Sequence, residues 1–511
     1  MSHIIGIDIG TSGIKVGAMN NEGVLRYLEY QQYSLIYPEM GLVEIDLEDV
    51  WQKTKALLLK VWLQVETVGK VEAISLSTFC NSSVFLAENG EVLHQGITYL
   101  DQRSRAECDW IKRTVGEDLI FKITKNRLEP GMHTLTTLLW FKNHFPEAYK
   151  NMYKWGNLST FIMHKLTGRF VMDWTQSSYS GMYDIENYEW SAAIYESVGI
   201  DREKLPDVVA PSSIVGHLIL DEAPLSPVPV IAGAADTACS TVALGIGVNE
   251  MFESVGTSNV LTTCMDNPEV LDIRFMNRCH VLKDRWLSHG PMSFPGAAVQ
   301  WFYEQFLKSE GHSKEILCEL AKDSIPGANG VFFLPYMQGE RAPIWDGDAR
   351  GVFVGIHLNT TKADMYRAVL EGCAFGLRQI DEIIKTKYKL HFEGFPSIGG
   401  GAKNKEWARI KANVLNKKIH LKDICETGVL GTCLIAGAAI GWYSSLENAA
   451  NEISNNTILI VEPEEELLRS YDELHPVFNE LYPSLQSFFA LSANARSRAN
   501  KLKNVDSEVF I

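Results

Sequence analysis

The sequence contains no Cys-x-x-Cys pair, no excess of basic residues and no long uninterrupted apolar run. Its nine cysteines are odd in number and scattered, which predicts reduced thiols in a cytoplasmic protein, not a disulfide framework or a zinc site. The formal net charge is −16, whereas nucleic acids and anionic membranes attract basic surfaces. We therefore expect no nucleic-acid or membrane partner, and any anionic ligand must be bound locally by backbone N–H groups, a few cations or a metal.

Two further absences concern the membrane. The first residues show no basic segment followed by an apolar run, so the sequence predicts no signal peptide. The most apolar stretch, Gly428 to Trp442, is short and interrupted by glycine, which argues against a spanning helix.

The chain of 511 residues is too long for one ordinary core, so two or more domains are expected. Alternating and β-branched residues predict strands over 4–9, 14–19 and 24–30. Apolar residues that return every three or four positions predict a helix over 49–65. The stretch 229–247 is typical of a strand, a tight turn of small residues and a helix.

Two short glycine segments resemble each other. Gly10-Thr11-Ser12 and Gly256-Thr257-Ser258 each follow an apolar strand and precede another one. One such tripeptide carries little information, but two, each opening one half of the chain, indicate two related lobes. We therefore predict domains over 1–248 and 249–450, followed by a helical extension over 451–511.

The first segment has the residues of a phosphate-binding loop. Glycines let backbone N–H groups approach an anion, hydroxyls add donors, and Lys15 follows on the next strand. Asp8 ends the preceding strand, and a carboxylate facing a triphosphate would repel it unless a cation such as Mg²⁺ bridged the two. The segment thus predicts an ATP site with Asp8 as metal ligand; the alternative is a plain hairpin with a hydrogen-bonded aspartate.

A third glycine run, Gly399 to Ala402, joins a predicted strand to a helix that begins near Glu406. Small residues at such a junction leave room for a flat ring, so Gly400, Gly401 and Ala402 are candidates to flank adenine. The alternative is a tight turn without a ligand.

Asp236 follows Gly-Ala-Ala at the start of a predicted helix. Its small neighbours leave the carboxylate accessible, and a helix N-terminus favours the ionised form that accepts a proton. We expect it to be the catalytic base of a phosphoryl transfer, although an aspartate that only caps the helix is the simpler alternative.

Taken together, these residues resemble the FGGY family of carbohydrate kinases, within the superfamily of actin, hexokinase and Hsp70 ATPases. The matching stretches are "GIDIGTSGIKV", "GLVEIDLEDVW", "GAADTACSTVALGIG", "SVGTSN", "GERAPIWDGDARGVFVGIHLNTTKADMYRAVLEGCAFGLR" and "GGGAKNKEW". The resemblance implies an α/β, two-lobed actin-like ATPase (ribonuclease H-like) fold with a duplicated sheet and helix domain and a central cleft. It also implies ATP and Mg²⁺ as cofactors, Asp236 as the catalytic residue, Asn404 in the adenosine motif, and a homodimer. Thr137 departs from the family, which usually has lysine there.

The resemblance further places substrate contacts at "TFCNSSVF" and "YLDQRS", that is, at Cys80, Asn81, Asp101 and Arg103. Xylulose kinases usually have Met-His-Gly at the first of these places and gluconate kinases Met-His-Ser, so Cys80-Asn81-Ser82 fits neither. No cation lies between Ser75 and Leu86, and a sugar acid would have to use Arg103 or a distant group. This favours a neutral ketose.

We therefore expect phosphorylation of the terminal primary hydroxyl of a ketopentose, D-xylulose to D-xylulose 5-phosphate. Gluconate, ribulose, L-xylulose or a polyol are alternative substrates. An actin- or Hsp70-like nucleotide switch is the rival of another class. Trp155, Trp174 and Tyr179 are candidates to line the sugar site, with a core role as the alternative.

Overall fold

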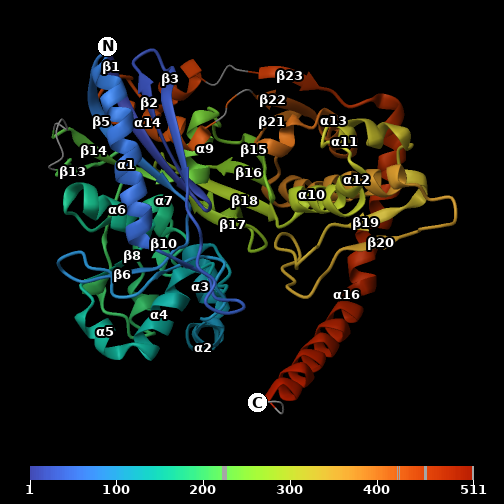
Figure 1. The fold of residues 1–511 in the computed structure, drawn as a ribbon, viewed down its shortest axis with the longest axis horizontal. Helices are drawn as coiled ribbons and strands as arrows, with labels where there is room; N and C mark the ends of the chain where they lie inside the picture. Colours follow the sequence, from blue (N-terminus) through green and yellow to red (C-terminus); the bar gives the residue numbers. More distant parts are fainter. Residues whose placement is uncertain (221–226, 423, 425, 454–456, 509–511) are drawn as a thin grey trace. The chain divides into compact units, whose positions relative to one another are not determined.

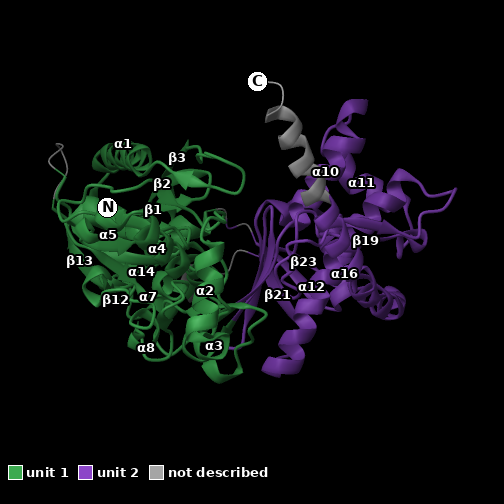
Figure 2. Ribbon diagram, turned by 90° about the horizontal axis from the view of Figure 1, so that it is seen from below, with its two compact units in different colours: residues 1–248, 264–288, 426–455 green, residues 249–263, 289–425, 456–511 purple. Residues whose placement is uncertain are grey.

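A computed structural model describes residues 1–220, 227–422, 424, 426–453 and 457–508. The chain divides into two compact units (Figure 2). Unit 1 comprises residues 1–248, 264–288 and 426–455, and unit 2 comprises residues 249–263, 289–425 and 456–511. The chain passes between the units more than once, and domain limits at residues 249 and 451 stay a proposal.

Unit 1 is built on a six-stranded sheet (Figure 1). Its strands lie in the order β13 (Ile214–His217), β14 (Pro229–Ala235), β5 (Lys70–Thr78), β1 (Ser2–Gly10), β2 (Gly13–Asn20) and β3 (Leu25–Gln32). β1 pairs antiparallel with β2 and parallel with β5, and β5 pairs parallel with β14. The three predicted opening strands are confirmed, and the segment 229–247 forms β14 followed by α9 (Asp236–Ala243) as expected.

Alternation along β1 decides where Asp8 points. Side chains of a strand alternate between the two faces of the sheet. Ile5, Ile7 and Ile9 enter the buried core that includes α1 (Leu47–Glu66). The opposite face meets α14 (Thr427–Ala439), because a Cβ on Gly6 would lie 2.7 Å from Cys433 Sγ. Asp8 shares that face with Gly6, so it is directed toward the α14 side of the sheet.

The rest of unit 1 consists of short helices and strands. They include α2 (Arg105–Val115), α3 (Glu117–Thr124), α4 (Thr134–His144), α5 (Pro146–Asn151), β8 (Lys154–Gly156), α6 (Leu158–Thr167), β9 (Val171–Asp173), α7 (Trp174–Ser177) and β17 (Met276–Cys279). Phe145, the residue before Pro146, separates α4 from α5. Thr137 is buried within α4.

Unit 2 contains a second sheet, in which β16 (Asn259–Met265), β15 (Met251–Val255), β21 (Gly394–Ile398), β22 (Lys418–Lys422) and β23 (Thr457–Val461) are successive neighbours. Its main helices are α10 (Pro295–Phe306), α12 (Lys362–Ile383), α13 (Lys405–Leu415) and α16 (Glu465–Glu508). The predicted likeness of the two glycine segments extends to their structure. Each occupies the turn of an antiparallel hairpin, β1–β2 in unit 1 and β15–β16 in unit 2.

Candidate active site

Asp8 lies near the carboxyl end of β1, opposite Lys15 of β2 in the strand register. Ser77 Oγ of the neighbouring strand β5 donates a hydrogen bond of 2.7 Å to Asp8 Oδ1. Burial raises the pKa of the Asp8 carboxyl to about 6, and the negative charges of Asp236 and Glu426 act in the same direction. A Cβ on Gly428 would lie 2.5 Å from the Asp8 carboxyl carbon, so any other residue there would displace this carboxyl.

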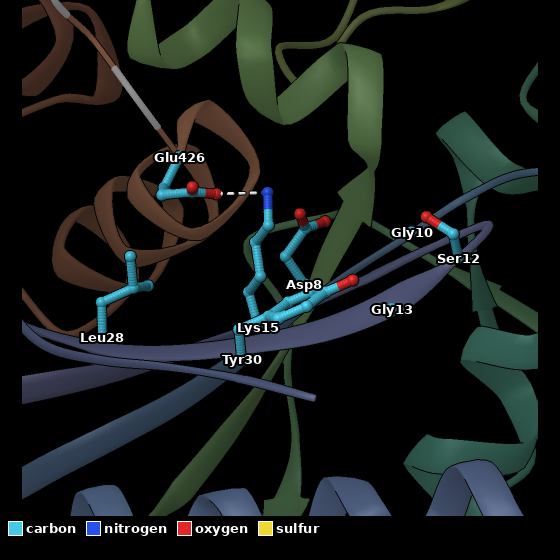
Figure 3. Close-up of a pocket in the computed structure, with 8 residues that line it drawn as sticks. All are labelled: Asp8, Gly10, Ser12, Gly13, Lys15, Leu28, Tyr30 and Glu426. Atoms are coloured by element: carbon cyan, nitrogen blue, oxygen red, sulfur yellow. Dashed lines mark ion pairs between the residues drawn. The ribbon is translucent and has the colours of Figure 1, made fainter. Parts of the chain in front are cut away.

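A cavity of about 390 Å³ opens beside this carboxylate (Figure 3). It is lined by Asp8, Gly10, Ser12, Gly13, Lys15, Leu28, Tyr30 and Glu426. Lys15 does not pair with Asp8 but forms an ion pair of 2.5 Å with Glu426, as the dashed line in the figure marks. This pairing raises the pKa of Lys15 despite partial burial, which by itself lowers it.

The predicted first phosphate loop forms one end of this cavity. Gly10 and Gly13 face each other across the β1–β2 turn, and the Gly10 carbonyl accepts a hydrogen bond of 2.5 Å from Tyr33. Thr11 Oγ1 lies 3.5 Å from the hydroxyl of Tyr99, and Ser12 is exposed. The loop therefore keeps hydroxyl and backbone groups next to the Asp8 carboxylate.

Asp236 is the first residue of α9 and follows β14 directly. Since β14, β5 and β1 are parallel neighbours, their carboxyl ends share one edge of the sheet, and Asp236, Ser77 and Asp8 come from that edge. Asp236 Oδ1 accepts hydrogen bonds from the backbone N (2.6 Å) and the hydroxyl (3.2 Å) of Thr237. Oδ2 has no hydrogen bond to a described residue, so Asp236 keeps one carboxylate oxygen for a ligand.

The residues after β5 lie in a buried polar cluster. Cys80 Sγ accepts a hydrogen bond of 3.2 Å from Arg278 Nη1 of β17, and the Arg278 guanidinium lies 4.3 Å from the ring centre of Tyr179. Asn81 has a left-handed backbone (φ 67°) and its Nδ2 contacts Met132 Sδ at 3.3 Å. Of these five residues, Cys80, Asn81, Tyr179 and Arg278 are buried. The structure thus brings two predicted substrate residues together with a cation.

Asp101 and Arg103, the other predicted substrate residues, engage each other. Arg103 Nε and Nη2 donate to the two Asp101 carboxylate oxygens at 2.9 and 2.8 Å, and Arg103 also pairs with Glu44 at 2.8 Å. The guanidinium stacks on Trp140 at 4.8 Å. Val43 N donates to Asp101 Oδ2 at 2.6 Å. The charge of Arg103 is therefore already matched by carboxylates of the protein.

Among the aromatic candidates, Trp155 is fully buried and packs against Trp190. Trp174 donates its indole N–H to the carbonyl of His280 at 2.7 Å. Both contacts serve packing, whereas Tyr179 lies in the polar cluster.

In unit 2 the second and third glycine segments lie close together. Gly256 and Thr257 are exposed at the β15–β16 turn, which closes through a hydrogen bond of 2.8 Å from Gly256 N to Ser258 O. A Cβ on Gly401 would lie 2.4 Å from Val255 Cγ1, the residue just before that turn. Gly400, Gly401 and Ala402 form a 3-10 turn between β21 and α13.

Asn404 begins α13. Its Oδ1 accepts a hydrogen bond of 3.0 Å from Trp407 N, the arrangement of a helix N-cap, and its Nδ2 donates to Tyr366 at 3.4 Å. A second cavity, of about 690 Å³, lies beside this helix and is lined by Cys318, Glu319, Lys322, Lys403, Lys405, Glu406, Arg409, Val461, Glu462 and Glu464. The cavity is lined by charged side chains of both signs, as is typical of a solvent-exposed surface.

Comparison with known proteins assigns the chain to a family. Residues 3–243 match the N-terminal domain of the FGGY family of carbohydrate kinases, and residues 251–471 match its C-terminal domain. The chain belongs to this family. It is an ATP-dependent carbohydrate kinase with the two-lobed α/β fold of actin-like ATPases, and both predictions are thereby confirmed.

Individual FGGY kinases are similar over nearly their whole length. The xylulose kinase of Staphylococcus xylosus is 29% identical over 499 residues, which cover 94% of this chain and 100% of that protein. The gluconokinase of Bacillus licheniformis is 26% identical over 515 residues, with 98% and 99% covered. The solved structure of ligand-bound xylulose kinase from Lactobacillus acidophilus has a TM-score of 0.88 at 25% identity, covering 96% of this chain and 99% of that one.

Two site residues of this FGGY kinase escaped the sequence-based reasoning, Glu426 and Arg278. Glu426 lies just before α14 and forms an ion pair with Lys15. Arg278 lies in the segment 264–288, which the sequence-based division assigned to the second domain but which packs within unit 1. The available signal was the charged residue in the short strand "MNRC", all of whose residues are buried. Burying a charge without a partner costs free energy, so such a residue is a candidate for a functional role.

Within the described ranges, no helix combines the length and apolar character that a bilayer crossing requires. The same residues hold no cluster of three or more His, Cys, Asp or Glu side chains able to bind a metal by themselves. Mg²⁺ bound to a nucleotide usually takes one or two carboxylates, with phosphate oxygens and waters as the other ligands. A carboxylate whose protein partners include no cation, as at Asp8, fits that role.

Proposed function

We propose that this FGGY kinase transfers the γ-phosphoryl group of ATP to the terminal primary hydroxyl of an open-chain sugar. D-Xylulose, giving D-xylulose 5-phosphate, is the first candidate because relatives of that name match nearly the whole chain. Gluconate is the second candidate, favoured by a buried cation, Arg278, near Asp236. The single observation behind the proposal is the shared sheet edge from which Asp8 and Asp236 project.

In the proposed reaction Asp236 accepts the proton of the substrate hydroxyl as that oxygen attacks the γ-phosphorus. A bond forms between this oxygen and phosphorus, and the bond from phosphorus to the β,γ-bridging oxygen breaks, so that ADP leaves. The half-buried position of Asp236 at the start of α9 supports this role, since its Oδ2, which has no hydrogen bond to a described residue, can face a hydroxyl.

The nucleotide contacts are also proposals. Gly10, Thr11, Ser12 and Lys15 of unit 1, and Gly256, Thr257 and Ser258 of unit 2, would contact phosphates, and Gly400 to Ala402 with Asn404 would flank the adenosine. Asp8 would hold Mg²⁺, which when bound neutralises phosphate charge. The residue types and their turn conformations support these assignments.

Two broader expectations remain proposals. We place the enzyme in the cytoplasm because the eight described cysteines are free thiols, as is usual for proteins of a reducing compartment. We also propose a homodimer, which light scattering behind a size-exclusion column would test.

The decisive test is an assay of ADP release with D-xylulose, D-gluconate, D-ribulose, L-xylulose and a polyol. At least one sugar should stimulate release strongly over the rate without sugar. ATP hydrolysis that no sugar stimulates would instead support a nucleotide switch.

Asp236→Asn tests the catalytic base. The variant should bind ATP like the wild type but lose turnover by roughly 10²- to 10⁴-fold, the usual contribution of general base catalysis. ATP binding is measured by calorimetry and turnover by ADP release. Near-normal turnover would remove Asp236 from this role.

A further inference from the structure

The guanidinium of Arg278 is the unusual group of the polar cluster. Its side chain is buried, and arginine keeps its charge at any pH at which a protein folds. No described carboxylate lies within ion-pair distance of it. Asp173 and Asp236 act on it only as more distant charges. Burying an unpaired charge is costly, so its retention calls for an explanation.

The hydrogen bonds of Arg278 leave its Nε unpaired. Nη1 donates to Cys80 Sγ, a weak acceptor. Nε is buried and has no hydrogen-bond partner, and the hydroxyl of Tyr179 is the other neutral polar group that acts on the guanidinium. Nε and Nη2 form the edge that binds a carboxylate through two parallel hydrogen bonds. The protein thus presents a buried guanidinium whose Nε has no acceptor among the described residues.

The backbone around Arg278 is held firmly. Asn277 N donates to Asn126 Oδ1 and Asn126 Nδ2 donates to Asn277 O, both at 2.8 Å. Cys279 N donates to Ser178 Oγ at 3.0 Å. Tyr179 covers one face of the guanidinium. The orientation of Arg278 is therefore fixed before any ligand arrives, which is the arrangement expected of a recognition group.

The polar cluster contains further unpartnered polar atoms. Asn81 Oδ1 and His133 Nε2 are both buried without a hydrogen-bond partner. Asn81 contacts Met132, and the rings of His133 and Tyr179 are 6.4 Å apart, so both belong to the cluster of Arg278. Neutral polar groups of this kind bind hydroxyls, whereas only Arg278 matches a negative charge.

We propose that Arg278 binds the carboxylate of the substrate through its Nε–Nη2 edge, so that the enzyme prefers a sugar acid, a polyhydroxy carboxylate, over a neutral sugar. Asn81 and His133 bind hydroxyls of the same molecule. This inference rests on the proposed kinase function, and within that function it favours the second candidate substrate, gluconate, over D-xylulose.

The test compares matched substrates that differ in one group. D-Gluconate and D-glucitol share the hydroxyls at C2 to C6 and differ at C1, in carboxylate against CH₂OH, and D-xylonate and xylitol form a second pair that differs in the same way. Wild-type kcat/KM should be higher for the acid in at least the first pair. Arg278→Leu should lower the ratio of acid to neutral substrate by roughly 10- to 100-fold, as expected for the loss of a charge-assisted pair. Arg278→Lys should retain part of it.

Arg274→Leu is the matched control. Arg274 lies four residues earlier in the same segment and pairs with Asp272 at 2.8 Å, so its removal should leave the ratio unchanged. A wild type that prefers the neutral member of the first pair, or an Arg278→Leu ratio equal to that of the wild type, overturns the inference and leaves the kinase proposal intact.

A binding experiment without ATP separates this inference from the reaction. Calorimetric titration of D-gluconate and D-glucitol should show binding of the acid by wild type and Arg274→Leu, with a loss of at least tenfold in Arg278→Leu. Binding of D-gluconate that does not depend on Arg278, or no binding of D-gluconate, contradicts the proposal. If acid binding depends on Arg278 but no sugar stimulates ADP release, the kinase proposal fails and the anion site stands.

Discussion

Lys411 in unit 2 and Arg278 in unit 1 are both almost completely buried cations, but their surroundings differ. Lys411 Nζ lies 2.7 and 2.6 Å from the two carboxylate oxygens of Glu253, which also accept hydrogen bonds from Asn259 and Ser397. Both members of that ion pair are fully buried. Arg278 has a thiol and an aromatic ring instead of a carboxylate.

Asp8 is the negative counterpart of Arg278 in unit 1. Lys15 stands opposite it in the strand register but pairs with Glu426, and Ser77 supplies a neutral donor. The buried ion pair of Lys411 and Glu253 in unit 2 is complete within the protein and therefore has a structural role. In the proposed scheme the charges of unit 1 that lack an ion-pair partner would be satisfied by ligands of opposite sign, a metal ion at Asp8 and an anion at Arg278.

The largest expected effect on stability comes from breaking the ion pair between Lys411 and Glu253. Lys411→Met leaves Glu253 buried without a cation, and breaking a buried ion pair in this way costs about 3–5 kcal/mol of stability. Urea unfolding followed by tryptophan fluorescence measures it, with Trp407 of the same helix as a local reporter. Lys405→Met, an exposed position on α13, should be nearly neutral. A loss as small as that of the control would show that the pair is not structural.

A smaller effect follows from the pKa of Asp8. Because the folded protein raises this pKa from 3.8 to about 6, the folded carboxyl holds its proton between these pH values while the unfolded one has lost it. Stability of the metal-free protein should therefore fall as pH rises from about 4 to 6, by on the order of 2–3 kcal/mol, and level off above.

Asp8→Asn isolates the contribution of Asp8 to the pH dependence of stability, since it removes the titrating carboxyl and keeps a side chain of the same shape. The difference in unfolding free energy between wild type and variant, measured by urea titration from pH 4 to 7 in EDTA, should follow the predicted curve. A difference that does not change with pH would mean that Asp8 is not held in an unfavourable charged state. In the presence of Mg²⁺ and ATP the cost should shrink for the wild type alone.

Much of unit 1 around Asp8 follows from the sequence. The period-two alternation of "IIGIDIG" and the turn residues Gly10 to Gly13 specify a hairpin with a carboxylate at its end, because these signals are local. Asp236 was placed by the same kind of signal, a strand followed by small residues and a helix. The two glycine segments even predicted that each unit would begin with such a hairpin.

The position of Arg278 could not be predicted in the same way. Its neighbours Cys80, Asn81 and Tyr179 lie about 100 to 200 positions away, and they meet only because residues 264–288 return to unit 1 through contacts such as Asn126–Asn277. Strand and turn propensities carry no information about such long-range packing. The same holds for the pairing of Lys15 with Glu426, more than 400 positions apart. As a result the sequence favoured a neutral ketose, since no nearby cation was visible.

The smallest expected effect on stability is that of Arg278→Leu, which removes the other buried cation of the comparison. Arg278→Leu removes a buried charge that has no carboxylate partner, so the variant no longer bears the cost of desolvating it. It also loses the contact with the Tyr179 ring and the hydrogen bond to Cys80, which are worth on the order of 1–2 kcal/mol together. These terms oppose each other, and the free energy of unfolding without ligand should change by less than about 1 kcal/mol.

Arg278→Leu and Lys411→Met each remove a buried cation of similar exposure, and their losses of stability should differ several-fold. The same urea titration without ligand measures both. A loss of 3 kcal/mol or more in Arg278→Leu, similar to that of Lys411→Met, would mean that Arg278 is already satisfied within the protein by the more distant Asp173 and Asp236. In that case the unpaired Nε would be a structural feature of unit 1, and the charge of the substrate would have to be recognised elsewhere.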